Sequence, residues 1–164
     1  MTVIYKPKGR AFEYSPLAVN LYTGCLYGCK YCYAPGVCHK KRSTFHSIAE
    51  PRKDILERLE DDCKKMKGDP RDILLCFTSD PYQPITDVTR EALLILEKYE
   101  MRANILTKGG MRASRDFDLL ARNEWKFGTT LLFWSGGPQN QWEPFSPSIS
   151  NRYQAISLAQ SRGI

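Results

Sequence analysis

Short apolar runs alternate with segments of helical periodicity along the whole chain. The runs expected to form strands are LAVNLY (17–22), ILLCF (73–77), ANIL (103–106) and GTTLLFW (128–134). Four helices are also expected. The first has Pro51 in its first turn, the second covers VTREALLILEKY (88–99), the third follows an N-cap at Ser114, and the fourth runs from Ile149 to near Gly163. Repeated strand–helix alternation predicts an α/β fold, with a parallel sheet and right-handed crossovers.

Polar or otherwise unusual segments follow each of the four expected strands. These are the loop that begins at Cys25, TSDPYQP (78–84), TKGG (107–110) and WSGG (134–137). Because the carboxyl ends of parallel strands meet at one rim of the sheet, we expect these segments to form a site.

The size and composition are those of one globular domain. The chain has 164 residues, of which 42% are hydrophobic and 26% charged. It contains no apolar run of about 18 residues, and its first residues lack the apolar stretch of a secretory signal. We therefore expect a cytoplasmic protein with no membrane association. In a reducing compartment, clustered cysteines bind metal or carry out redox chemistry more often than they form disulfides.

The charge balance is basic, with a net charge of +6 and a pI of about 9.0. Such a balance is compatible with a nucleic-acid or anionic partner. The densest basic run, His39–Arg42, is equally typical of a solvated loop, so charge alone leaves a nucleic-acid partner open.

The most specific motif is C-x3-C-x2-C, formed by Cys25, Cys29 and Cys32. Three thiolates can bind three irons of a cubane cluster and leave the fourth iron without a protein ligand. A structural zinc completed by Cys38 or His39 is the alternative. The two remaining cysteines, Cys63 on a helix and Cys76 inside a strand, are expected to be core residues.

The motif, with an aromatic residue before its last cysteine, resembles the radical S-adenosylmethionine (radical SAM) signature. Further segments resemble the spore photoproduct lyase-like branch: IYKPKGRAFEYSPLAVNLYTGCLYGCKYCYAP, TSDPYQPIT, ILTKGG, SRDFDLL and EPFSPSISNRYQAISLAQSRGI. The resemblance implies a partial (β/α) barrel, usually of six strands. Residues 1–164 would be its N-terminal part, a single core domain with about four βα units. Four units cannot close a barrel, so the last strand would present an unpaired edge that favours self-association.

The resemblance also implies cofactors and chemistry. A 4Fe–4S cluster on Cys25, Cys29 and Cys32 would bind S-adenosylmethionine at its open iron. Reduced by a flavodoxin- or ferredoxin-type donor, it would generate a 5′-deoxyadenosyl radical that abstracts hydrogen from an unknown substrate.

The other residues that the resemblance assigns lie near the strand ends. Ser79 and Asp80 would hold the methionine ammonium, and Lys108 its carboxylate; the alternatives are a turn-capping aspartate and a solvated lysine. Tyr31 would lie beside the adenine or pack the loop against the sheet, and Ser135 would contact the ribose hydroxyls. Tyr33 matches a tyrosine that photoproduct lyases carry after the last cysteine, where a radical relay is one interpretation.

One departure weakens DNA repair as the activity. Photoproduct lyases carry a hydrogen-donating cysteine three residues before the position of Asp80, where this chain has Phe77. Cys76 precedes it, and strand alternation would point the two side chains to opposite faces. DNA photoproduct repair therefore remains an alternative, as does a non-catalytic zinc- or nucleic-acid-binding module.

Overall fold

A computed structural model describes residues 2–84 and 88–164, so Ile85 and Thr86 of the TSDPYQPIT segment lie outside the described residues. Its centre is a four-stranded parallel sheet with strand order β1-β4-β5-β6. The strands are β1 (Leu17–Val19), β4 (Asp72–Leu75), β5 (Arg102–Thr107) and β6 (Lys126–Thr129). The expected parallel α/β organisation is confirmed, as an open sheet with β1 and β6 at its edges.

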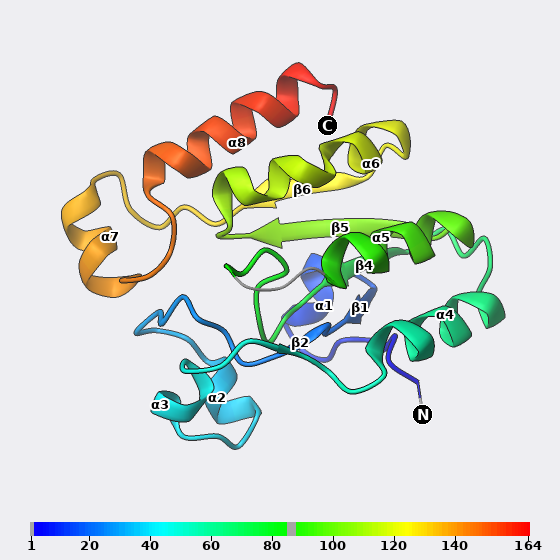
Figure 1. The fold of residues 1–164 in the computed structure, drawn as a ribbon, viewed down its shortest axis with the longest axis horizontal. Helices are drawn as coiled ribbons and strands as arrows, with labels where there is room; N and C mark the ends of the chain where they lie inside the picture. Colours follow the sequence, from blue (N-terminus) through cyan, green and yellow to red (C-terminus); the bar gives the residue numbers. More distant parts are fainter. Residues whose placement is uncertain (1, 85–87) are drawn as a thin grey trace.

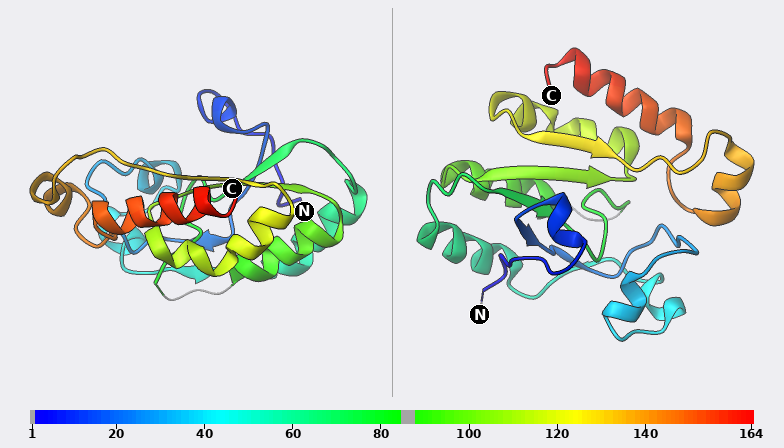
Figure 2. Two further views of the ribbon diagram at one scale, coloured as in Figure 1. Left: turned by 90° about the horizontal axis from the view of Figure 1, so that it is seen from above. Right: turned by 180° about the vertical axis from the view of Figure 1, so that it is seen from behind.

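The helices that directly precede β4, β5 and β6 and the last helix lie on one face of the sheet. They are α4 (Ile55–Lys65), α5 (Val88–Lys98), α6 (Phe117–Arg122), which follows the 3-10 helix η1 (Gly110–Asp116), and α8 (Ile149–Ser161). Spatial strand order follows chain order, so each crossover steps in the same direction and places its helix on the same side. Figure 2 shows these helices on one side of the sheet and α1 (Ala11–Tyr14) on the other.

Shorter elements surround the cysteine loop. They are the antiparallel pair β2 (Tyr22–Thr23) and β3 (Glu50–Pro51), with α2 (Ala34–Val37) and α3 (Arg42–Phe45) between them, and the later helix α7 (Gly136–Trp142). In Figure 1, α2 and α3 lie beyond the carboxyl edge of the sheet, below α7. None of the helices in the described ranges is long and apolar enough to cross a membrane.

Two expectations about the ends of elements are wrong. Pro51 does not begin a helix; it pairs with Tyr22 in the small sheet, and α4 begins only after Asp54, whose φ of 52° is left-handed. Ser114 does not cap a helix, since it lies inside η1 and donates its hydroxyl to the carbonyl of Met111 at 2.8 Å.

Three strands are also shorter than the apolar runs that predict them, and the first of them, β1, ends at Val19 although its run continues to Tyr22. β4 ends at Leu75, and Cys76 has a left-handed φ of 70°, so it lies beyond the strand and not inside it. The LLFW segment likewise follows β6 and does not belong to it. Local apolar runs mark the buried part of a chain, but hydrogen-bond partners decide where a strand stops.

The core lies between the sheet and the covering helices. Ile73 and Leu75 of β4 and Leu93 of α5 are fully buried there, and burial of each such side chain contributes about 2 kcal/mol. Cys63 is fully buried in α4, and Cys76 is also in the core, as the sequence predicts for both. The core thereby holds the carboxyl ends of β4 and β5 in register.

Candidate functional site

The three clustered cysteines line one cavity of about 130 Å³ at the carboxyl edge of the sheet. They come from the loop between β2 and α2, and the opposite wall comes from the segments that follow β4 and β5. The predicted residues that line this cavity are Cys25, Cys29, Cys32, Tyr31, Tyr33, Ser79, Asp80 and Lys108. The convergence of segments expected from the sequence is therefore present for the first three strand ends.

Two glycines with left-handed backbone shape the cysteine loop. Gly24 has φ 81°, and a Cβ there would collide with the carbonyl oxygen of Ile48. Gly28 has φ 63°, and a Cβ there would lie 2.9 Å from the ring of Phe145. The loop therefore turns tightly on both sides of Cys25, which places the cysteines on its inner side.

Burial raises the pKa of two of these thiols, those of Cys25 and Cys29. The negative charge of Asp80 adds to the effect of burial on the pKa of Cys25. Lys108 has a smaller, opposing effect on the pKa of Cys29. A metal centre bound here would take the thiolate forms and displace their protons.

The donor set fits an iron–sulfur cluster. All three cysteines are free, and soft thiolates are the ligands that such clusters use. Within residues 2–84 and 88–164, no three Cys, His, Asp or Glu side chains converge on a single metal ion. A cubane cluster does not need that convergence, because its thiolates bind different irons. Cys38 lines a separate cavity with Lys40 and Arg52, and His39 is exposed.

Asp80 ties the end of β4 to the end of β5. Its Oδ1 accepts the amide of Tyr82 at 2.9 Å and the hydroxyl of Thr107 at 2.5 Å, and its Oδ2 accepts the amide of Lys108 at 2.7 Å. Burial raises the pKa of Asp80, although these hydrogen bonds act in the opposite direction. The turn-capping interpretation is thus present, and one acceptor position on Oδ2 remains for a further donor.

Ser79 and Lys108 complete the polar wall. The Ser79 hydroxyl is buried beside the Cys76 thiol and has no oxygen or nitrogen hydrogen-bond partner among the described residues. Lys108 Nζ lies 5.6 Å from the ring centroid of Tyr31. A thiol is only a weak hydrogen-bond partner for a hydroxyl, so the wall has capacity for a polar ligand.

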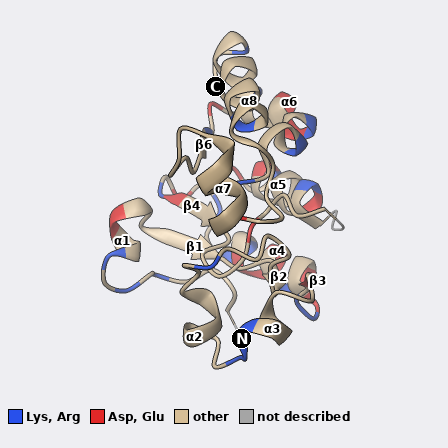
Figure 3. Ribbon diagram, turned by 90° about the vertical axis from the view of Figure 1, so that its left-hand side faces the viewer, with Lys and Arg blue, Asp and Glu red and all other residues tan. Residues whose placement is uncertain are grey.

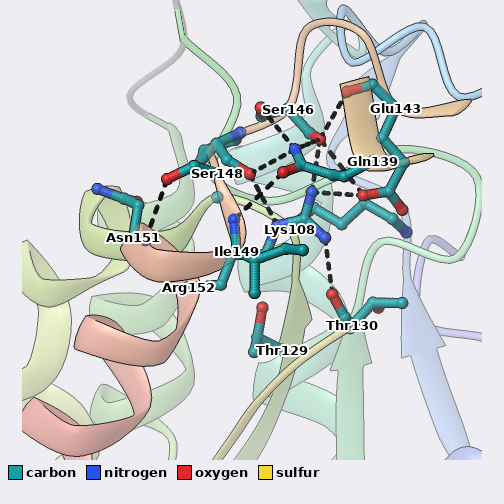
Figure 4. Close-up of polar contacts among 12 residues, drawn as sticks. Lys108, Thr129, Thr130, Gln139, Glu143, Ser146, Ser148, Ile149, Asn151 and Arg152 are labelled. Atoms are coloured by element: carbon teal, nitrogen blue, oxygen red, sulfur yellow. Dashed lines mark hydrogen bonds and ion pairs between the residues drawn. The ribbon is translucent and has the colours of Figure 1, made fainter. Parts of the chain in front are cut away.

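Tyr31 links the cysteine loop to a buried ion pair that the sequence analysis missed. Its hydroxyl donates to the Glu143 carboxylate, and Glu143 pairs with Arg152 Nη2 at 2.5 Å. Both side chains are almost fully buried, each residue being 1% exposed. Figure 4 shows Arg152 of α8 also reaching the Thr130 carbonyl, which it does through Nη1 at 2.8 Å. The available signal was a charged residue three positions after Ile149, on the apolar face of the helix.

A larger cavity of about 440 Å³ adjoins the first and shares Tyr33, Phe77, Ser79, Asp80 and Lys108 with it. Its other walls include Arg10 and Tyr14 from the N-terminal segment.

Cys76 and Phe77 both line this larger cavity, so the expectation that they face opposite sides is wrong. The left-handed backbone of Cys76 interrupts strand alternation there. Ser135 is exposed at the start of α7 and lines neither cavity.

Comparison with known proteins identifies the fold. No protein-family model matches the chain. A solved structure of a spore photoproduct lyase mutant, with bound AdoMet and dinucleoside spore photoproduct, superposes with a TM-score of 0.67 at 18% identity, covering 98% of this chain and 45% of that one. The chain therefore has a fold similar to part of a radical SAM enzyme.

A second similarity is in amino-acid sequence. An uncharacterized protein of Methanocaldococcus jannaschii is 32% identical over 153 residues, which cover 89% of this chain and 56% of that protein. The chain thus spans about half the length of the proteins that it matches.

Proposed function

We propose that this chain is the cofactor-binding part of a radical SAM enzyme related to spore photoproduct lyase. Cys25, Cys29 and Cys32 would hold a 4Fe–4S cluster. The observation that carries the proposal is that these cysteines share one cavity with polar groups from two strand ends, in a fold similar to that of the AdoMet-bound lyase.

The side chains of the cavity have separate roles in this proposal. The Ser79 hydroxyl and the remaining acceptor position of Asp80 bind the ammonium of S-adenosylmethionine, as a hydroxyl and a carboxylate suit a cation. Lys108 binds its carboxylate, and Tyr31 is held by Glu143 at the edge of the same cavity. The reduced cluster would supply one electron to S-adenosylmethionine, which would give methionine and a 5′-deoxyadenosyl radical for hydrogen abstraction, and a flavodoxin- or ferredoxin-type protein would reduce the cluster. The exposed position of Ser135 gives no support to a ribose contact.

Anaerobic reconstitution with iron and sulfide, followed by EPR of the reduced protein with and without S-adenosylmethionine, tests the proposal. We expect a 4Fe–4S signal that changes when S-adenosylmethionine is added. Cys32→Ala should lose the signal, whereas Cys38→Ala should keep it, because Cys38 lines another cavity. Uptake of zinc alone, with loss of metal in Cys38→Ala, would instead establish the structural zinc alternative.

Repair of damaged DNA is the second candidate function. It is favoured by the dinucleoside photoproduct bound to the similar lyase, and by aromatic residues with Arg10 in the larger cavity. Preferential binding of lesion-bearing over undamaged duplex, weakening steeply with salt, would support it. Equal affinity for both duplexes would argue against it.

A further inference from the structure

One short segment, Arg42–His46, holds the backbone carbonyls of all three clustered cysteines. Arg42 donates from Nη1 to the Cys29 carbonyl at 3.0 Å and from Nη2 to the Cys32 carbonyl at 2.8 Å. His46 Nδ1 lies 2.8 Å from the Cys25 carbonyl. A carbonyl only accepts, so Nδ1 carries the hydrogen of this bond.

Backbone packing joins the same segment to the loop. The amide of Cys25 donates to the Phe45 carbonyl at 3.2 Å, so residues 45 and 46 satisfy both backbone polar groups of Cys25. The Phe45 ring is buried in a small cluster with Cys25, Tyr27, Cys29 and Ala34. The segment therefore packs directly against the cysteine loop.

We propose that Arg42 and His46 are positioning residues for the cluster, an inference that rests on the proposed function. A fixed carbonyl fixes the peptide plane after each cysteine, and with it the direction of the Cα–Cβ bond that carries the sulfur. Three thiolates must be presented at a set spacing to bind three irons, and preorganisation lowers the cost of assembling them. The two side chains thus act through the backbone without touching the metal.

Arg42 has a second effect through its charge. A 4Fe–4S core of charge +2 with three thiolates is a monoanion, and the added electron makes it a dianion. The permanently charged guanidinium lies at the Cys29–Cys32 end of the loop and stabilises the dianion more than the monoanion. It therefore shifts the reduction potential of the cluster to a less negative value.

Geometry and charge can be separated by paired variants. Arg42→Lys keeps the charge but loses the planar fork that reaches two carbonyls, whereas Arg42→Gln loses both. His46→Asn keeps an N–H donor close to the position of Nδ1, and His46→Leu removes it. Lys41→Gln removes a charge from the adjacent exposed residue and serves as the control.

The experiment measures iron and sulfide content, the rate of cluster loss to a chelator, and the midpoint potential of the reconstituted protein. Arg42→Gln should lose its cluster at least about tenfold faster, as expected for the loss of charge-assisted hydrogen bonds to two carbonyls, and have a more negative potential. Arg42→Lys should lose it faster at a potential near that of the unmodified protein. His46→Leu should also lose it faster, with His46→Asn restoring the rate. Lys41→Gln should keep the original rate.

Two results would overturn the inference and differ in what they say of the proposed function. If the unmodified protein binds the cluster and Arg42→Gln matches it in both rate and potential, the positioning role is wrong while the proposed function stands. If the unmodified protein takes up no 4Fe–4S cluster, both are wrong. Far-UV circular dichroism checks the folding of each variant, and the His46 pair tests the role independently if Arg42→Gln does not fold.

Discussion

Arg152 and Glu143 form an ion pair at a depth where neither side chain reaches solvent. Substitution of Glu143 by Gln would leave the Arg152 guanidinium buried without a counter-charge. We expect Glu143→Gln to lower the free energy of unfolding by about 3 kcal/mol, measured by urea denaturation. The exposed pair Asp61–Lys64 is the control, and Asp61→Asn should change the stability by less than about 0.5 kcal/mol. Equal effects of the two substitutions would contradict this account of the buried pair.

Gly24 determines how the chain enters the cysteine loop. Alanine there meets both an unfavourable φ of 81° and the Ile48 carbonyl, so Gly24→Ala should cost about 2 kcal/mol or more of stability. Gly36 is the matched control, because it lies in α2 with open space where a Cβ would be. Gly36→Ala should be neutral or slightly stabilising. Thermal unfolding of both variants decides between a local steric requirement and a general sensitivity of glycine positions.

Between elements, Arg90 joins α5 to the start of α6. It donates to Asp116 at 2.9 Å and to both carboxylate oxygens of Asp118, at 3.0 and 2.9 Å. Figure 3 shows both basic and acidic residues on these two neighbouring helices. The hydrogen bond from Arg90 lowers the pKa of Asp118 to about 2. Because Arg90 and Asp118 are partly exposed, solvent screens the pair and its contribution to stability is small.

The pH dependence of stability tests this contact. Asp118 has a folded-state pKa below the unfolded value of about 3.9, so its contribution is complete above that pH and is lost as the pH falls towards 2. The unmodified protein should therefore lose more stability between pH 5 and pH 2 than Asp118→Asn, as measured by urea unfolding at each pH. If the stability of the two proteins changed with pH in parallel, Asp118 would have the same pKa in the folded and the unfolded state, which would contradict this account.

At the scale of the molecule, the two edges of the sheet differ. The β1 edge is partly covered, because Tyr5 forms an antiparallel bridge with Ala18. Among the described strands, β6 pairs only with β5, and the segment after it exposes Leu132 and Trp134, the latter 90% exposed. An unpaired edge beside exposed apolar side chains is a template for pairing with another chain.

We therefore expect this chain to self-associate through the β6 edge at micromolar concentration. Trp134→Lys should shift sedimentation towards the monomer, because a charge at an edge opposes pairing. Leu94→Lys, at an exposed position of α5, is the control and should leave the association unchanged. If the protein stayed monomeric at all concentrations, the prediction that the β6 edge mediates self-association would be wrong.

Most of the fold and the candidate cluster ligands could be predicted from the sequence, because their signals are local. Apolar runs and helical periodicity located the four strands and the four covering helices. The spacing of Cys25, Cys29 and Cys32 identified the thiols that share one cavity. The placement of TSDPYQP and TKGG at strand ends anticipated Asp80 and Lys108 on its wall, because parallel strands bring their carboxyl ends together.

Only the tertiary structure decided which distant residues support those groups. Tyr31 and Glu143 are 112 positions apart, and Asp80 and Lys108 are 28 apart, so no local period couples them. In the sequence Arg42 is only the last residue of a basic run, and its hydrogen bonds to two cysteine carbonyls depend on how the chain folds back at α3. Spacing along the chain therefore determined the chemical groups and the sheet. Long-range packing determined which backbone turns, buried charges and carbonyl contacts hold those groups in place.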